Sequence, residues 1–209
     1  MTPRARVRMS GQERREQLLD VGRSVFAERG FDAASIEEIA QRAGITKPVV
    51  YEHFGGKEGL YAVIVDREVQ NLISRFSSNV LEESHPRGML EKAAQTFLRY
   101  IEEEKEGFRI LVRDSPVGST TGTLASVISD IASQVEYIFA GEFKTRGYDV
   151  KLAPLYSQAL VGMVALVGQW WLDAGKPSRS EVSAHLVNLA WNGLKDLDAD
   201  PSGTRSKKD

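Results

Sequence analysis

Apolar residues recur every three or four positions along most of the chain, which is the spacing of one face of an α-helix. Short stretches rich in Gly, Pro and Ser separate these segments, and almost no segment has the alternation typical of a strand. The pattern predicts about nine helices, over residues 11–29, 36–43, 46–54, 57–81, 86–101, 107–112, 124–144, 154–174 and 179–197. It therefore predicts an all-α fold.

The second predicted helix has a start signal and a stop signal in the sequence. Ser35 is a candidate N-cap, and Glu38 three residues later completes the pattern of a capping box. Gly44 suits a left-handed C-terminal end, which a side chain would resist. We therefore expect a helix of about two turns between these residues.

The third predicted helix follows after a tight turn. Thr46 can cap it, Pro48 lies in its first turn, and the pair at residues 55–56 is Gly-Gly, which ends it. Two short helices around a Gly-containing turn are typical of a helix-turn-helix, whose second helix enters the DNA major groove. A helical hairpin without a DNA role has the same outline. Candidate DNA contacts on or capping this helix are Thr46, Lys47, Pro48, Val49, Tyr51 and His53, and Lys47 is the first choice for a guanine edge.

This segment resembles the DNA-binding signature of the TetR family of bacterial transcriptional regulators. The matching residues are Ile36, Ile39, Ala40, Ala43, Gly44, Ile45, Thr46, Tyr51, Phe54, Lys57, Glu58 and Leu60, together with residues 25–31 before them. The resemblance covers roughly residues 11–62 and implies that Ser35, Tyr51 and Lys57 contact phosphates. The sequence departs from the family at Pro48 and Val49, where relatives often have Gly and a hydroxyl residue. The DNA bases that relatives prefer therefore cannot be assigned to this protein.

The last two predicted helices resemble the family's dimerisation element. Residues 152–172 contain no charge and approach the length of a membrane span. Polar residues interrupt the segment, and such a helix can instead be buried against its own domain and a partner subunit. We expect a homodimer and no membrane insertion, with small and apolar residues at the seam: Gly162, Ala165, Gly168, Leu186, Leu189 and Gly193.

Aromatic residues are spread over at least four helices of the C-terminal part. Each one could be a core residue, but the resemblance implies that some line an apolar ligand cavity. Arg109 and Arg113 could place a charge there or pair with acidic residues across the bundle. The cavity candidates are Phe97, Tyr100, Phe108, Arg109, Arg113, Tyr137, Tyr156 and Trp170. The resemblance thus implies a repressor that a small apolar or aromatic effector releases from a palindromic DNA operator.

The amino-acid composition argues against an enzyme, a metal-binding protein or a cofactor-binding protein. The chain of 209 residues is 42% hydrophobic and 27% charged, which suits a folded protein with a core. It has no cysteine, its three histidines lie in separate segments, and no pattern of a catalytic triad is present. We therefore expect no enzyme activity, no metal and no cofactor. The N-terminus lacks an apolar run after its basic residues, so we expect a cytoplasmic protein.

The distribution of charged residues and the positions of Gly, Pro and Ser between helices suggest the domain organisation. We expect a DNA-binding domain over residues 1–55, a ligand-binding and dimerisation domain over 56–200, and a disordered tail over 201–209. Residues 115–123 suggest a loop without the order of a phosphate-binding loop. The N-terminal arm is rich in arginine and could be either a solvated tail or a DNA contact: Arg4, Arg6, Arg8, Arg14 and Arg15.

Overall fold

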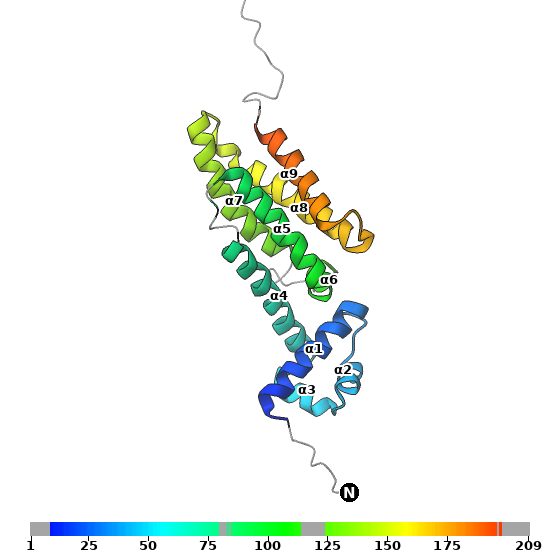
Figure 1. Cartoon of the computed structure of the whole chain (residues 1–209). Helices are drawn as coiled ribbons and strands as arrows, with labels where there is room; N and C mark the ends of the chain where they lie inside the picture. The colour runs from blue at the N-terminus through cyan, green and yellow to red at the C-terminus, as the bar shows by residue number, and fades with distance from the viewer. Residues whose placement is uncertain (1–8, 80–82, 84, 114–123, 196, 198–209) are drawn as a thin grey trace, which may run out of the picture. The chain divides into compact units, whose positions relative to one another are not determined.

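The computed structural model describes residues 9–79, 83, 85–113, 124–195 and 197. Over these residues it contains nine α-helices, one short 3-10 helix and no strand, so the predicted all-α fold is confirmed (Figure 1). The helices are α1 (Gly11–Arg29), α2 (Ile36–Ala43), α3 (Lys47–Phe54), α4 (Lys57–Asn79), α5 (Pro86–Glu103), α6 (Lys105–Arg113), α7 (Leu124–Arg146), α8 (Ala153–Ala174) and α9 (Arg179–Lys195), with η1 (Val150–Leu152) before α8.

Helix α6 differs from its predicted bounds at both ends. This helix begins earlier than predicted because the carbonyl of Glu104 already accepts the N–H of Phe108, at 2.9 Å. For α4, the predicted end lies outside the described residues. So do the expected loop at 115–123, the first part of the arginine-rich arm and the expected disordered tail.

The chain divides into two compact units. Unit 1 comprises residues 1–71 and 104–124, and unit 2 comprises 72–103 and 125–209. The sequence had suggested a boundary near residue 55, with α6 in the C-terminal domain. The structure places α6 in unit 1 because it packs against α1 and buries Phe108 completely.

Close packing joins the helices of unit 1. At Gly22 in α1, an added Cβ would lie 3.0 Å from Leu60 of α4, so a small residue permits the two helices to approach. The Arg23 guanidinium lies 2.9 Å from Glu68 of α4 and 2.5 Å from Glu104 at the start of α6. Burial and ion pairing therefore act together on α1, α4 and α6.

Unit 2 is built around α5, α8 and α9, and α5 packs on both of the others. Gly168 of α8 permits the contact with α5, since a Cβ there would lie 2.6 Å from both Phe97 and Ile101. The Trp171 indole N–H donates to the Pro177 carbonyl at 2.7 Å, which fixes the turn between α8 and α9. Gly168 thus allows α8 to pack closely against α5 in the core of unit 2.

Candidate nucleic-acid interface

Helix α2 begins and ends at the predicted residues. The Ser35 hydroxyl accepts the Glu38 N–H at 3.2 Å, and Gly44 is left-handed, with φ of 67°. The predicted capping box is formed only in part. The Glu38 carboxylate pairs with Arg42 at 2.6 Å, because a cation one helical turn along α2 is a stronger partner than the Ser35 backbone N–H.

Helix α3 presents a short exposed surface at its N-terminus. Thr46 occupies the N-cap position, but its side chain makes no capping hydrogen bond, contrary to the sequence prediction, so the hydroxyl is not used within the helix. Val50 is completely buried and fixes α3 against unit 1. The exposed candidates are Thr46, Lys47, Pro48 and Tyr51, the last with 53% of its surface exposed, whereas Val49 and His53 are half-buried.

Lys57, at the start of α4, holds the loop before α2. Its ammonium donates to the carbonyls of Phe31 at 2.9 Å, Asp32 at 3.3 Å and Ala34 at 3.2 Å. It also lies 4.5 Å from the centre of the Phe31 ring. The resemblance implied a phosphate contact for Lys57, but here the charge is engaged by the backbone next to Ser35. These hydrogen bonds hold the backbone that leads into α2, and the phosphate contact of Lys57 stays a prediction.

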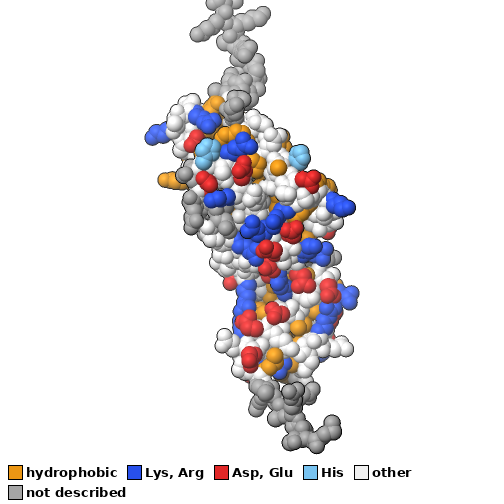
Figure 2. Space-filling view, viewed as in Figure 1, with side chains coloured by type: hydrophobic (Ala, Val, Ile, Leu, Met, Phe, Trp, Pro, Cys, Tyr) orange, Lys and Arg blue, Asp and Glu red, His pale blue; other side chains and the backbone are white. Residues whose placement is uncertain are grey.

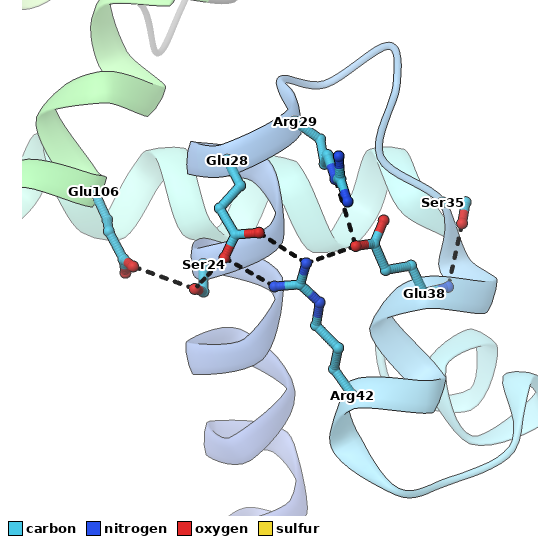
Figure 3. Close-up of polar contacts among 7 residues, drawn as sticks. All are labelled: Ser24, Glu28, Arg29, Ser35, Glu38, Arg42 and Glu106. Carbon is cyan, nitrogen blue, oxygen red and sulfur yellow. Dashed lines mark hydrogen bonds and ion pairs between the residues drawn. The ribbon is translucent and has the colours of Figure 1, made fainter.

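Arg42 forms the centre of a polar network between α1 and α2 (Figure 3). Its guanidinium donates two hydrogen bonds to Glu28, at 2.9 and 2.7 Å, and one to Glu38. The hydrogen bonds from Arg42 lower the pKa of Glu28, and the Glu28 carboxylate in turn raises the pKa of Arg42 above its ordinary value. On the same side, Ser24 donates to Glu28 at 3.4 Å and to Glu106 of α6 at 3.2 Å, so the network continues from α2 through α1 to α6.

An arginine of α1 contacts the C-terminal end of α3. Arg15 of α1 donates to the carbonyl of His53 at 2.8 Å, and its guanidinium lies 4.3 Å from the centre of the Phe54 ring. Sequence reasoning assigned Arg15 to the basic arm and missed this role. No local signal could have revealed it, since its partner lies 38 residues further along the chain.

The predicted effector residues belong to two different units and differ in burial. Phe97 and Tyr100 are buried in the unit 2 core, whereas Phe108 is buried in unit 1. Arg109 is exposed, and the side chain of Arg113 is not among those that the structure describes.

The remaining effector candidates lie on α7 and α8. Tyr137 is 84% exposed and Trp170 is 57% exposed, so these two do not line a cavity in a single chain. Tyr156 is half-buried, with its ring 5.4 Å from that of Phe143. Among the effector candidates, Phe97, Tyr100 and Tyr156 are thus the buried or half-buried aromatic residues of unit 2, and the cavity itself stays a prediction.

The predicted dimer residues fall into two groups. Ala165, Gly168 and Leu186 are buried within unit 2, which corrects their assignment to a surface. Gly162 and Gly193 have no atom within 4 Å of an added Cβ, and Leu189 is 63% exposed.

Further apolar side chains are exposed along α8. They are Leu155, Leu166 and Trp170, 62%, 68% and 57% exposed, and with Gly162 they repeat at helical spacing. The segment Val150–Ala174 is long and apolar enough to cross a membrane. Only 17% of its most apolar stretch is buried inside the protein. A large apolar face of this kind marks an interaction surface.

The α2–α3 geometry is that of a helix-turn-helix, which a second helical unit accompanies. Residues 18–64 match the model of the bacterial regulatory proteins of the tetR family, and residues 86–193 match a tetracyclin repressor-like C-terminal domain. The chain belongs to the TetR family of transcriptional regulators, as the resemblance predicted. It is a DNA-binding regulator by family.

Similar proteins share most of the chain. It is 30% identical over 188 residues to the transcriptional activator FasR of Mycolicibacterium smegmatis, covering 90% of this chain and 85% of FasR. It is 33% identical over 203 residues to the transcriptional repressor KstR2 of Rhodococcus jostii, covering 93% and 98%. The crystal structure of a TetR-like regulator from Rhodococcus sp. RHA1 superposes with a TM-score of 0.77 at 25% identity, covering 91% and 100%. The similar proteins include both an activator and a repressor.

Proposed function

We propose that this protein is a homodimeric repressor that binds a palindromic operator through α3 and releases it when a small apolar effector binds unit 2. The observation that carries the proposal is the exposed N-terminal surface of α3, held by a buried Val50 and by caps at both ends of α2. The family match supports DNA as the partner of that surface.

In the proposed complex α3 lies in the major groove. Helix N-terminal residues contact base edges in this docking geometry, which places Lys47 and Thr46 nearest the bases. Pro48, Val49 and His53 belong to the same helix, and Tyr51 and Ser35 can donate hydroxyl hydrogen bonds to phosphates. Replacement of Lys47 by Ala should weaken operator binding by roughly 1–3 kcal/mol and relax preference at one base pair.

The exposed apolar face of α8 and α9 supports a two-fold dimer. In an isologous interface the same surface of each copy meets its equivalent, which suits the open positions Leu155, Gly162, Leu166 and Trp170 along α8 and the exposed Leu189 on α9. Covering these positions with a second copy removes apolar surface from water without a membrane. A dimer also places two α3 helices on successive half-sites of an operator. We place this regulator in the cytoplasm, with the DNA it binds.

An effector acts only if it binds the conformation that does not fit the operator better than the one that does. Phe97, Tyr100 and Tyr156 make an apolar or aromatic compound the best-supported class. A coupling free energy of roughly 1–3 kcal/mol would change operator affinity about 5–150-fold. Helix α4 is the proposed link, because it contributes residues to both units.

The test begins with genomic fragments selected by the purified protein. A bound fragment with inverted half-sites supports the operator, and a scrambled duplex of the same length is the control. Compounds that raise the melting temperature are then added to the operator complex. If every stabilising compound leaves operator affinity unchanged, the effector mechanism is wrong while DNA binding stands. Reporter expression with and without the protein then distinguishes repression from activation.

A further inference from the structure

Every Lys and Arg between residues 14 and 67 has an intramolecular partner among the described residues. The pairs are Arg14 with Gln17, Arg15 with the His53 carbonyl, Arg23 with Glu104, Arg29 with Glu38, Arg42 with Glu28, Lys47 with Glu37, Lys57 with the Phe31 carbonyl, and Arg67 with Glu16. Basic and acidic side chains are accordingly interspersed over α1–α3 on the face shown in Figure 2, and Figure 3 shows Arg42 enclosed by acidic groups. Each of these eight cations therefore contacts DNA in competition with a partner that it already has.

Lys47 combines a single exposed partner with a place at the start of α3. Arg42 would lose two carboxylates and Lys57 three carbonyls, but Lys47 is held only by Glu37 of α2 among the described residues. Both side chains are exposed, 51% for Lys47 and 61% for Glu37. Exposed ion pairs contribute only about 0–1 kcal/mol. Lys47 is also the first residue of α3, where side chains meet base edges.

We propose that Glu37 is a specificity-determining residue, which keeps Lys47 neutralised on non-operator DNA and yields it only to a base edge of the operator. This inference rests on the proposed docking through α3. Affinity for any sequence comes from cations that neutralise phosphates, and a lysine held by a carboxylate adds no net charge to that sum. A good contact with guanine contributes roughly 1–3 kcal/mol, which exceeds the free energy of an exposed ion pair.

The Glu37 carboxylate carries a negative charge at the neutral pH at which the protein binds DNA. The hydrogen bond from Lys47 lowers the pKa of Glu37, so Glu37 is ionised at neutral pH. A phosphate near Lys47 also meets the negative charge of Glu37, which opposes the contact. A guanine presents neutral acceptor atoms and meets much less repulsion. The pair thus favours contact with a base over contact with the backbone.

The experiment replaces Glu37 by Gln and measures binding to the selected operator and to a scrambled duplex over a range of salt. With Lys47 freed to contact a phosphate, the slope of log affinity against log salt for scrambled DNA should steepen by about 0.9. The gain in affinity for scrambled DNA should then be about 3-fold smaller at about 200 mM salt than at about 50 mM. Operator affinity should rise by no more than about 5-fold, because only the exposed pair need no longer be broken.

Two further variants separate this mechanism from a general change of charge. Glu16→Gln removes the same charge from unit 1 and frees Arg67 from a comparably exposed pair, and it should leave the slope for scrambled DNA unchanged. Glu37→Gln combined with Lys47→Ala should return the slope to that of the unmodified protein. If the double variant keeps the steeper slope, or Glu37→Gln alone leaves the slope unchanged, the inference is overturned. If the unmodified protein does not prefer the operator over scrambled DNA, the proposed function itself fails.

Discussion

Replacing Lys57 by Met tests whether this lysine positions the loop before α2 or contacts DNA phosphate. Methionine keeps the apolar stem and removes the ammonium, which leaves three carbonyls without their donor. The loop that they belong to carries Ser35 and therefore sets the start of α2. We expect unit 1 to lose stability and α2 to lose its fixed position.

The magnitude follows from the contacts. The hydrogen bond to Phe31 is short and partly buried, the two others are longer, and the ammonium lies over the Phe31 ring. A hydrogen bond from a charged group contributes roughly 1.5–3 kcal/mol when buried, and a half-exposed one contributes less. Adding about 0.5–1 kcal/mol for the ring contact gives a loss of about 2–3 kcal/mol in the free energy of unfolding. The urea midpoint of unit 1 should fall by about 1 M.

Two spectroscopic probes separate the units. All three tryptophans, Trp170, Trp171 and Trp191, belong to unit 2, so their fluorescence reports on that unit, whereas circular dichroism reports on helices of both. The loss in the Lys57→Met protein should appear in the dichroism transition and be smaller in fluorescence. Lys47→Ala, which removes an exposed lysine from the same unit, should change stability by less than about 0.5 kcal/mol. If Lys57→Met leaves unfolding unchanged but weakens binding to every duplex and flattens the salt dependence, the positioning role is refuted.

Three further predictions concern packing, assembly and pH. Gly168→Ala should destabilise unit 2 by about 1–3 kcal/mol in urea unfolding, because its Cβ would overlap Phe97, and unchanged stability would contradict this contact. Leu166→Arg should convert dimers to monomers in sedimentation and abolish operator binding, and a monomeric unmodified protein would contradict the interface. The pKa of Glu28 is lowered by Arg42, so this pair should stabilise the protein above about pH 4.3 and lose its contribution as the pH falls further. Arg42→Ala should flatten acid unfolding in that range, and an identical acid profile would contradict the assignment.

The sequence alone determined the helix-turn-helix to a close approximation. Ser35 and Gly44 act on the backbone within a turn of their own position, so their signals are local and readable. The apolar spacing predicted the remaining helices for the same reason. The resemblance of residues 11–62 to the TetR family then predicted a DNA-binding transcriptional regulator, and the family match confirmed that class of function.

Only the tertiary structure decided which of these residues are available for binding. Sequence spacing could not distinguish Gly162, which lies open, from Gly168, which contacts α5, because both lie on one apolar helix. It assigned Lys47 to a base edge and Lys57 to a phosphate without showing that three carbonyls hold Lys57 and one exposed carboxylate holds Lys47. The partners of a long charged side chain lie on other helices, so they depend on how the chain packs rather than on its local pattern.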